Sequence, residues 1–240
     1  MRGNPLKAIF FDMGDTLFVH KSEDPRRFRM ERISRSLQEL GYDIEATTLL
    51  KEFNSVRKHL RETNPDIEFS LRCILSMAAA RVGIRERLPV VVEVMYEAYK
   101  EAAYEDLKLE EGARDAILEL KERGFEIGII SNASDFGIVR GLLKKERLYE
   151  LLDALAVSAN TVWKKPNRRI FEYALREAGV KAYEAMHVGD SLRSDVFGAK
   201  NVGMMAVWKA PKEDSSLLEK APVRPDIIIR KIKEILEFIE

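Results

Sequence analysis

The sequence lacks the features that would tie it to a membrane, to nucleic acid or to an oxidising compartment. It has one cysteine, Cys73, so no internal disulfide can form. Lysine plus arginine total 40, as do aspartate plus glutamate, so no net basic field attracts a polyanion. No segment approaches the roughly 20 apolar residues that span a bilayer, and no signal peptide precedes the first apolar run. We therefore expect a cytoplasmic protein that binds neither membranes nor nucleic acid.

What the sequence does contain is enough apolar material for a core beneath a strongly solvated surface. Hydrophobic residues make up 46% of its 240 residues and charged residues 33%. Cys73 lies among apolar neighbours in a helical stretch and is expected to pack in a core. The length allows one core domain with a sizeable insertion.

Short apolar runs alternate with helical periodicity through most of the chain. Such runs are typical of strands buried on both faces of a parallel sheet. The intervening helices imply right-handed crossovers and helices on both faces, so the fold class is α/β. Strands are expected at 7–11, 125–130, 154–157, 185–188, 205–208 and 227–229, and helices at 113–123, 136–145, 168–178 and 193–201. Residues 211–225 are expected to form a polar surface connection.

Between the first two of these strands the period is helical throughout. Breaks at Gly41, Pro65 and Gly83 divide residues 25–104 into four amphipathic helices, which predicts a small four-helix bundle. The predicted domains are a core of residues 1–18 and 110–240 and an inserted domain of residues 19–109.

Polar side chains follow the predicted strands. In an open parallel sheet, ligands bind beyond the carboxyl ends of the strands, so these positions are candidates for a site. Each has a structural explanation when taken singly, since aspartate or serine after a strand often caps a helix and a lysine is usually exposed. The positions are Asp12, Gly14, Asp15 and Thr16; Ser131 and Asn132; Lys165; and Asp190, Ser191 and Asp195.

Taken together, these residue types suit phosphoryl transfer. The reaction needs a nucleophile, cations that neutralise the phosphoryl oxygens, and donors that position them. A carboxylate can attack and form an aspartyl phosphate. Two carboxylates plus a backbone carbonyl suit a hard cation such as Mg²⁺.

The arrangement resembles the haloacid dehalogenase-like hydrolases with a helical cap inserted after the first motif. The resemblance rests on these segments: Phe10-Phe11-Asp12, Ile130-Ser131-Asn132, Lys165-Pro166, and His187-Val188-Gly189-Asp190-Ser191 with Asp195. It implies a Rossmann-like, doubly wound parallel sheet, an inserted four-helix cap and a hydrolase that acts on a small phosphorylated substrate as a monomer or homodimer.

The resemblance also implies a role for each motif residue. Asp12 is the expected nucleophile and a metal ligand, and Asp190 and the Gly14 carbonyl complete the protein ligands of Mg²⁺. Thr16 is expected to orient the nucleophile loop. Ser131, Asn132 and Lys165 are expected to bind the transferring phosphoryl group, and Asp195 to order metal-bound water or the lysine.

The chain departs from the family pattern at one position. Phosphatases of this family usually carry a second aspartate, an acid and base, where this chain has Gly14, and the acidic residue comes one place later, at Asp15. The absence of this second aspartate is expected to slow hydrolysis of alkyl phosphates, since general acid–base assistance contributes roughly 10²–10⁴-fold to the rate. Three hypotheses follow: a preference for good leaving groups, substitution by Asp15 on closure, or phosphate binding without turnover.

Two other functions stay open. A 2-haloacid dehalogenase would share Asp12, Ser131 and Lys165, but such enzymes usually have a tyrosine at the position of Gly14 and need no metal. A non-catalytic phosphate-binding protein would explain Gly14 but not the retained acidic residues.

Other polar or aromatic residues have plainer explanations. His20 is expected in a solvated loop, and His187 in the core. Trp163 and Trp208 are expected to pack near strand ends. The basic run at 26–29 is expected on a solvated helix face, with anionic-substrate binding as the alternative.

Overall fold

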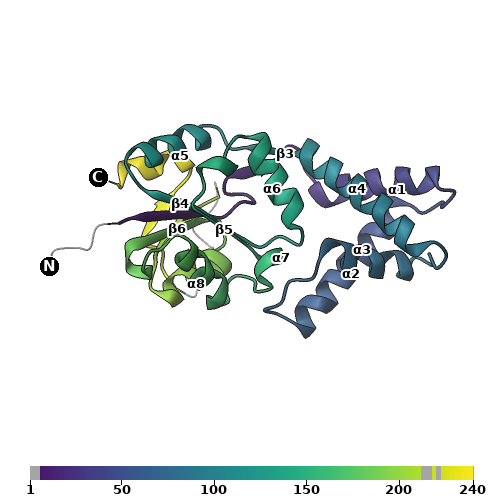
Figure 1. Ribbon diagram of the computed structural model, residues 1–240. Coiled ribbons are helices and arrows are strands. Elements are labelled where there is room, and N and C mark those ends of the chain that lie inside the picture. Colours follow the sequence, from purple (N-terminus) through teal and green to yellow (C-terminus); the bar gives the residue numbers. More distant parts are fainter. Residues whose placement is uncertain (1–5, 212–217, 220–222, 240) are drawn as a thin grey trace. The chain divides into compact units, whose positions relative to one another are not determined.

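The structure, a computed structural model, describes residues 6–211, 218, 219 and 223–239. The chain divides into two compact units (Figure 1). The first contains Met1–Val19 and Leu109–Glu240, and the second contains His20–Lys108. No helix among the described residues is both long and apolar enough to cross a membrane.

A six-stranded parallel sheet forms the centre of the first unit. Its strand order is β5-β4-β1-β6-β7-β8, so β1 lies inside the sheet between β4 and β6. This confirms the predicted α/β class. The strands are β1 (Ala8–Phe11), β4 (Glu126–Ser131), β5 (Ala154–Val157), β6 (Ala185–Gly189), β7 (Met205–Lys209) and β8 (Ile227–Ile229).

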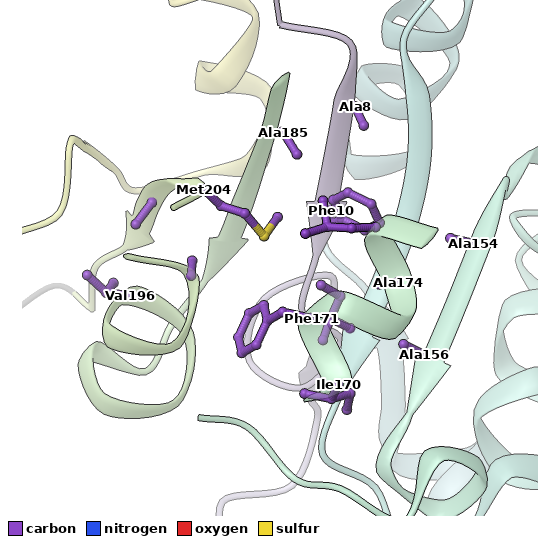
Figure 2. Close-up of a cluster of buried hydrophobic side chains, with 14 of the residues drawn as sticks. Ala8, Phe10, Ala154, Ala156, Ile170, Phe171, Ala174, Ala185, Val196 and Met204 are labelled. Atoms are coloured by element: carbon purple, nitrogen blue, oxygen red, sulfur yellow. The ribbon is translucent and has the colours of Figure 1, made fainter. Parts of the chain in front are cut away.

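Alternate residues of the central strands supply the two faces of the sheet. Ala8 and Phe10 of β1 belong to a buried cluster that also contains Phe171 of α8 (Arg168–Glu177), as Figure 2 shows. A Cβ at Gly128 of β4 would lie 2.4 Å from the Phe10 ring, so only glycine leaves room for this aromatic side chain. α9 (Gly198–Val202) covers the same face as α8.

Helix caps fix where the helices that flank the site begin. The Asn167 side chain accepts a hydrogen bond from the Arg169 amide at 3.1 Å at the start of α8. Asp135 accepts one from the Ile138 amide at 2.8 Å at the start of α6 (Phe136–Lys145). These side chains satisfy amides that have no partner within the helix. α5 (Ala113–Glu122) precedes β4 and packs against it and against the 3-10 helix Ile232–Glu237.

The second unit is helical. Each of its four helices packs against two of the others: α1 and α3 each contact both α2 and α4. The apolar residues repeat at three- and four-residue intervals and are buried along one face of each helix, for example Ile33 and Leu37 of α1. The helices are α1 (Pro25–Glu39), α2 (Ala46–Thr63), α3 (Leu71–Arg81) and α4 (Leu88–Asp106).

Three details differ from expectation or lie beyond it. β2 (Phe18–His20) and β3 (Leu107–Leu109) pair where the chain leaves and re-enters the first unit. No local sequence pattern predicts this short pairing. The helix expected at 193–201 is π-helical over Leu192–Phe197 before α9 begins. Most of the expected 211–225 connection lies outside the described residues.

Phe10→Ala is expected to lower the free energy of unfolding by about 3–5 kcal/mol, because it empties a fully buried ring site beside Gly128. Phe238→Ala is the matched control, since that ring is 51% exposed and its loss leaves no cavity. Chemical denaturation measures both. Equal effects of the two variants would contradict this account of the core.

Candidate functional site

The predicted site residues of the first unit meet at the carboxyl edge of the sheet. β1 runs beside β6 with Phe11 level with Val188, and beside β4 with Phe11 level with Ile129. The residues that follow, Asp12 and Asp190, therefore emerge from adjacent strands. The Asp12 amide continues the ladder by donating to the Val188 carbonyl at 2.8 Å.

Lys165 is the centre of this group. It lies in the loop before α8, it is 5% exposed, and its ammonium has three acceptors at 2.6 Å. They are a carboxylate oxygen of Asp12, a carboxylate oxygen of Asp195 and the Ile130 carbonyl. Three acceptors match the three N–H donors of an ammonium. The lysine thus joins β1, β4 and the segment after β6.

Asn132 holds the backbone of Lys165 in place. Its side-chain oxygen accepts from the Lys165 amide at 2.7 Å, and its side-chain nitrogen donates to the Lys165 carbonyl at 3.0 Å. The residue was predicted to bind the phosphoryl group, which stays a prediction; the side-chain contacts found are with this loop. Ser131, at the end of β4, is buried at the same edge.

Asp195 is buried and fully engaged. Besides Lys165 it accepts from the Ser191 amide at 3.0 Å, and its Oδ1 lies 2.9 Å from His187 Nε2. A Cβ at Gly189 would lie 2.3 Å from Asp195 Cγ, so the glycine allows the carboxylate to lie across β6. This contact gives Gly189 and Asp195 of the motif a shared structural role.

Asp190 is held through its backbone and its side chain. The buried Trp208 indole donates to the Asp190 carbonyl at 2.7 Å. Thr16 makes a longer contact of 3.4 Å from its hydroxyl to the Asp190 carboxylate. Burial, followed by the charge of Asp12, raises the pKa of Asp190 to about 7.

The loop after β1 has an unusual backbone. Asp15 has a φ of 54°, in the left-handed region that a non-glycine residue seldom occupies. The Lys209 ammonium donates to the Asp15 carbonyl at 2.9 Å and pairs with Glu110 at 3.0 Å. Glu110 also accepts from the Ile232 amide at 3.1 Å. This buried ion pair anchors the loop to the end of β7.

The buried charges shift one another's pKa values. Burial alone would lower the pKa of Lys165, but Asp12 and Asp195 outweigh it and the pKa is raised, so the ammonium stays charged. Burial would raise the pKa of Asp195, but Lys165 and His187 hold it well below its usual range. The pKa of Asp12 is raised by burial despite the attraction of Lys165. Burial lowers the pKa of His187.

The donor set fits a hard divalent cation. Asp12, Asp190 and Asp195 each offer an oxygen, and these oxygens lie within 4.8 Å of one another. Asp195 is already bound to Lys165, His187 and the Ser191 amide, which leaves Asp12 and Asp190 as the side chains best placed to hold the ion. Burial is the main cause of the raised pKa of Asp190, and the neighbouring negative charges of Asp12 and Asp195, which a cation would neutralise, raise it further.

Sequence reasoning missed several supporting residues. His187 was expected in the core, where it is buried, but its contact with Asp195 was not predicted. Trp208 was expected to pack near a strand end, and no pattern pointed to Lys209; both donate to backbone carbonyls of the site. The only local signal was a polar group within an apolar strand.

In the second unit, His20 was expected in a solvated loop, but its Nδ1 lies 2.6 Å from the carboxylate of the buried Asp106.

Comparison with known proteins agrees with this geometry. The family of haloacid dehalogenase-like hydrolases matches residues 6–203. The chain belongs to this family.

Two curated relatives match most of the chain. A glyceraldehyde 3-phosphate phosphatase from Pyrococcus abyssi (strain GE5 / Orsay) is 31% identical over 98% of this chain and 94% of that protein. A ribulose-1,5-bisphosphate 5-phosphatase from Halopiger xanaduensis is 28% identical over 89% of each. The solved structure of a 2-haloacid dehalogenase from Pseudomonas syringae pv. Tomato DC3000 has a TM-score of 0.73 at 21% identity over 97% of each chain, a likeness of fold.

Mg²⁺ binding is expected to weaken below about pH 7. Because the pKa of Asp190 is raised to about 7, the carboxyl is protonated below that pH and the cation must displace a proton. The binding constant should be about tenfold lower near pH 6 than near pH 8. Calorimetric titration of the metal-free protein measures this, and Asp190→Asn should abolish the binding. Binding that is independent of pH would contradict the assignment.

Lys209→Met is expected to lower the free energy of unfolding by about 3 kcal/mol, because it leaves Glu110 buried without its cation. Lys200→Met is the control. Its pair with Asp226 is about one-third exposed on each side, and loss of such a pair costs about 1 kcal/mol or less. Denaturant unfolding compares the two. A loss at Lys209 no larger than at Lys200 would show that the buried pair does not stabilise the loop.

Proposed function

We propose that this hydrolase is a Mg²⁺-dependent phosphatase that acts on a small phosphorylated metabolite through an aspartyl phosphate on Asp12. The observation that carries the proposal is the buried Asp12–Lys165–Asp195 group beside Asp190. The names of the relatives, which are phosphatases of small phosphorylated compounds, point the same way. Metal-free dehalogenation would use Asp12 but would give Asp190 no role as a metal ligand.

The proposed first step is attack by a carboxylate oxygen of Asp12 on phosphorus. The bond from phosphorus to the leaving oxygen breaks, and its electron pair departs with the leaving group. The positive charge of Lys165 offsets the negative charge of Asp12 and of the incoming phosphoryl oxygens, and the Ser131 hydroxyl donates a hydrogen bond to one of those oxygens. The ammonium of Lys165 is already held beside Asp12, so its charge needs little reorganisation in the transition state.

The second step hydrolyses the aspartyl phosphate. Water attacks phosphorus, the bond to the Asp12 oxygen breaks, and inorganic phosphate leaves. When bound by Asp12, Asp190 and the Gly14 carbonyl, Mg²⁺ neutralises charge on the phosphoryl oxygens. Asp195, held by His187, keeps the lysine oriented throughout.

We further propose that the helical domain of residues 19–109 acts as a cap that selects the substrate. The whole protein is proposed to act in the cytoplasm as a monomer or homodimer. The sequence of the helical domain differs in kind from the core: it carries none of the motif residues. Substrate selection on an inserted domain leaves the reacting groups of the core unchanged.

Asp12→Asn is expected to lower the rate of aryl phosphate hydrolysis by at least about 10³-fold, because the amide cannot form the covalent intermediate. The native rate should also vanish on removal of Mg²⁺ by a chelator and return when Mg²⁺ is restored. Asp226→Asn, a surface carboxylate outside the site, is the control. Undiminished turnover in Asp12→Asn would refute the proposed nucleophile.

A further inference from the structure

Gly14 leaves an open position beside the nucleophile. It lies two residues after Asp12, it is exposed, and an added Cβ would meet no atom within 4 Å. Its φ is not in the positive range that only glycine tolerates well. Neither space nor backbone conformation therefore requires glycine here. The position could hold a side chain that reaches a leaving group, and in this chain it holds none.

The neighbouring groups that could carry a proton are already engaged. All three hydrogens of the Lys165 ammonium have acceptors, and loss of one would leave two buried carboxylates without their cation. Asp195 is bound by that lysine, by His187 and by the Ser191 amide. Asp190 is a ligand of the cation in the proposed function.

Asp15 is the remaining acid of this loop, and its backbone constrains it. The left-handed conformation and the hydrogen bond from Lys209 fix its carbonyl toward β7. Its side chain starts one residue further along a tight turn than Gly14 does. A shift of one residue changes the direction of a side chain, so we treat Asp15 as displaced from the position of a leaving-group acid.

From this geometry we infer, on the basis of the proposed phosphatase function, that the substrates are acyl phosphates or phosphoanhydrides, whose leaving groups depart as stable anions without protonation. In the first half-reaction the carboxylate of Asp12 bonds to phosphorus while the phosphorus–oxygen bond of the anhydride breaks. The electron pair stays on the departing carboxylate or phosphate, which needs no proton. An alkoxide from an alkyl phosphate lacks this stability and requires an acid.

The same missing group has a consequence in the second half-reaction. Among the described residues of the site, Lys165 and Asp195 are engaged with one another and Gly14 offers no base, so the proton of the attacking water passes to a phosphoryl oxygen or to solvent. Hydrolysis of the aspartyl phosphate is then slower than its formation from a good leaving group. The phosphorylated protein accumulates, and the first turnover releases a burst of leaving group.

The experiment compares four substrates in order of decreasing leaving-group stability: acetyl phosphate, p-nitrophenyl phosphate, phenyl phosphate and glyceraldehyde 3-phosphate. For the native protein with Mg²⁺, kcat/KM should fall by at least about 10²-fold along the series. Rapid mixing with p-nitrophenyl phosphate should show a burst of about one p-nitrophenol per protein molecule.

Three variants identify the cause. Gly14→Asp, which the open space accommodates, should raise the ratio of kcat/KM for glyceraldehyde 3-phosphate to kcat/KM for acetyl phosphate by about 10²–10⁴-fold and remove the burst. Gly14→Asn has the same size without a titratable proton and should give none of these gains. Asp15→Asn should keep the native dependence on the leaving group.

The possible contrary results differ in what they overturn. A flat series in the native protein, or alkyl phosphate turnover that Asp15→Asn abolishes, would overturn the inference and leave the phosphatase function standing. Absence of both turnover and phosphorylated protein with all four substrates would overturn the phosphatase function and the inference with it. If thermal unfolding shows that Gly14→Asp does not fold, the substrate series and the burst of the native protein still test the inference.

Discussion

The site depends on the three hydrogen bonds of one buried ammonium. Lys165 binds Asp12, Asp195 and the Ile130 carbonyl, so a single side chain joins the proposed nucleophile, the end of a neighbouring strand and the segment that follows β6. A buried cation with fewer partners would lose its proton or destabilise the fold. The surrounding structure serves this group: Asn132 fixes the lysine backbone, His187 fixes Asp195, and Gly189 gives that carboxylate its space.

The balance of charge around the lysine also explains why the site suits a cation. One ammonium cannot neutralise Asp12, Asp190 and Asp195 together, and burial together with the surplus negative charge raises the pKa of Asp190. In the proposed function, a divalent ion would remove that surplus and an incoming phosphoryl group would restore part of it. Binding of metal, proton and substrate are therefore linked through the same few carboxylates.

A second buried pair, Lys209 with Glu110, supports the nucleophile loop from the other side. It holds the strained Asp15 backbone and connects it to the segment that returns from the helical unit. The loop is thus fixed at Asp12 by Lys165 and at Asp15 by Lys209. Gly14 lies between these two anchored points with open space around it, so the loop is rigid although it carries no side chain there.

The sequence by itself determined the parallel sheet, because buried strands leave unbroken apolar runs and their connecting helices leave a 3.6-residue period. It also placed the motif residues at strand ends, since strand-end polarity is a local signal. Only the tertiary structure decided that Asn132 turns to the Lys165 backbone, that His187 and Trp208 hold Asp195 and Asp190, and that Lys209 reaches Asp15. These contacts join residues as much as 194 positions apart. Local patterns indicate burial and periodicity, whereas such pairings depend on the order of the strands in the sheet, which brings distant segments together.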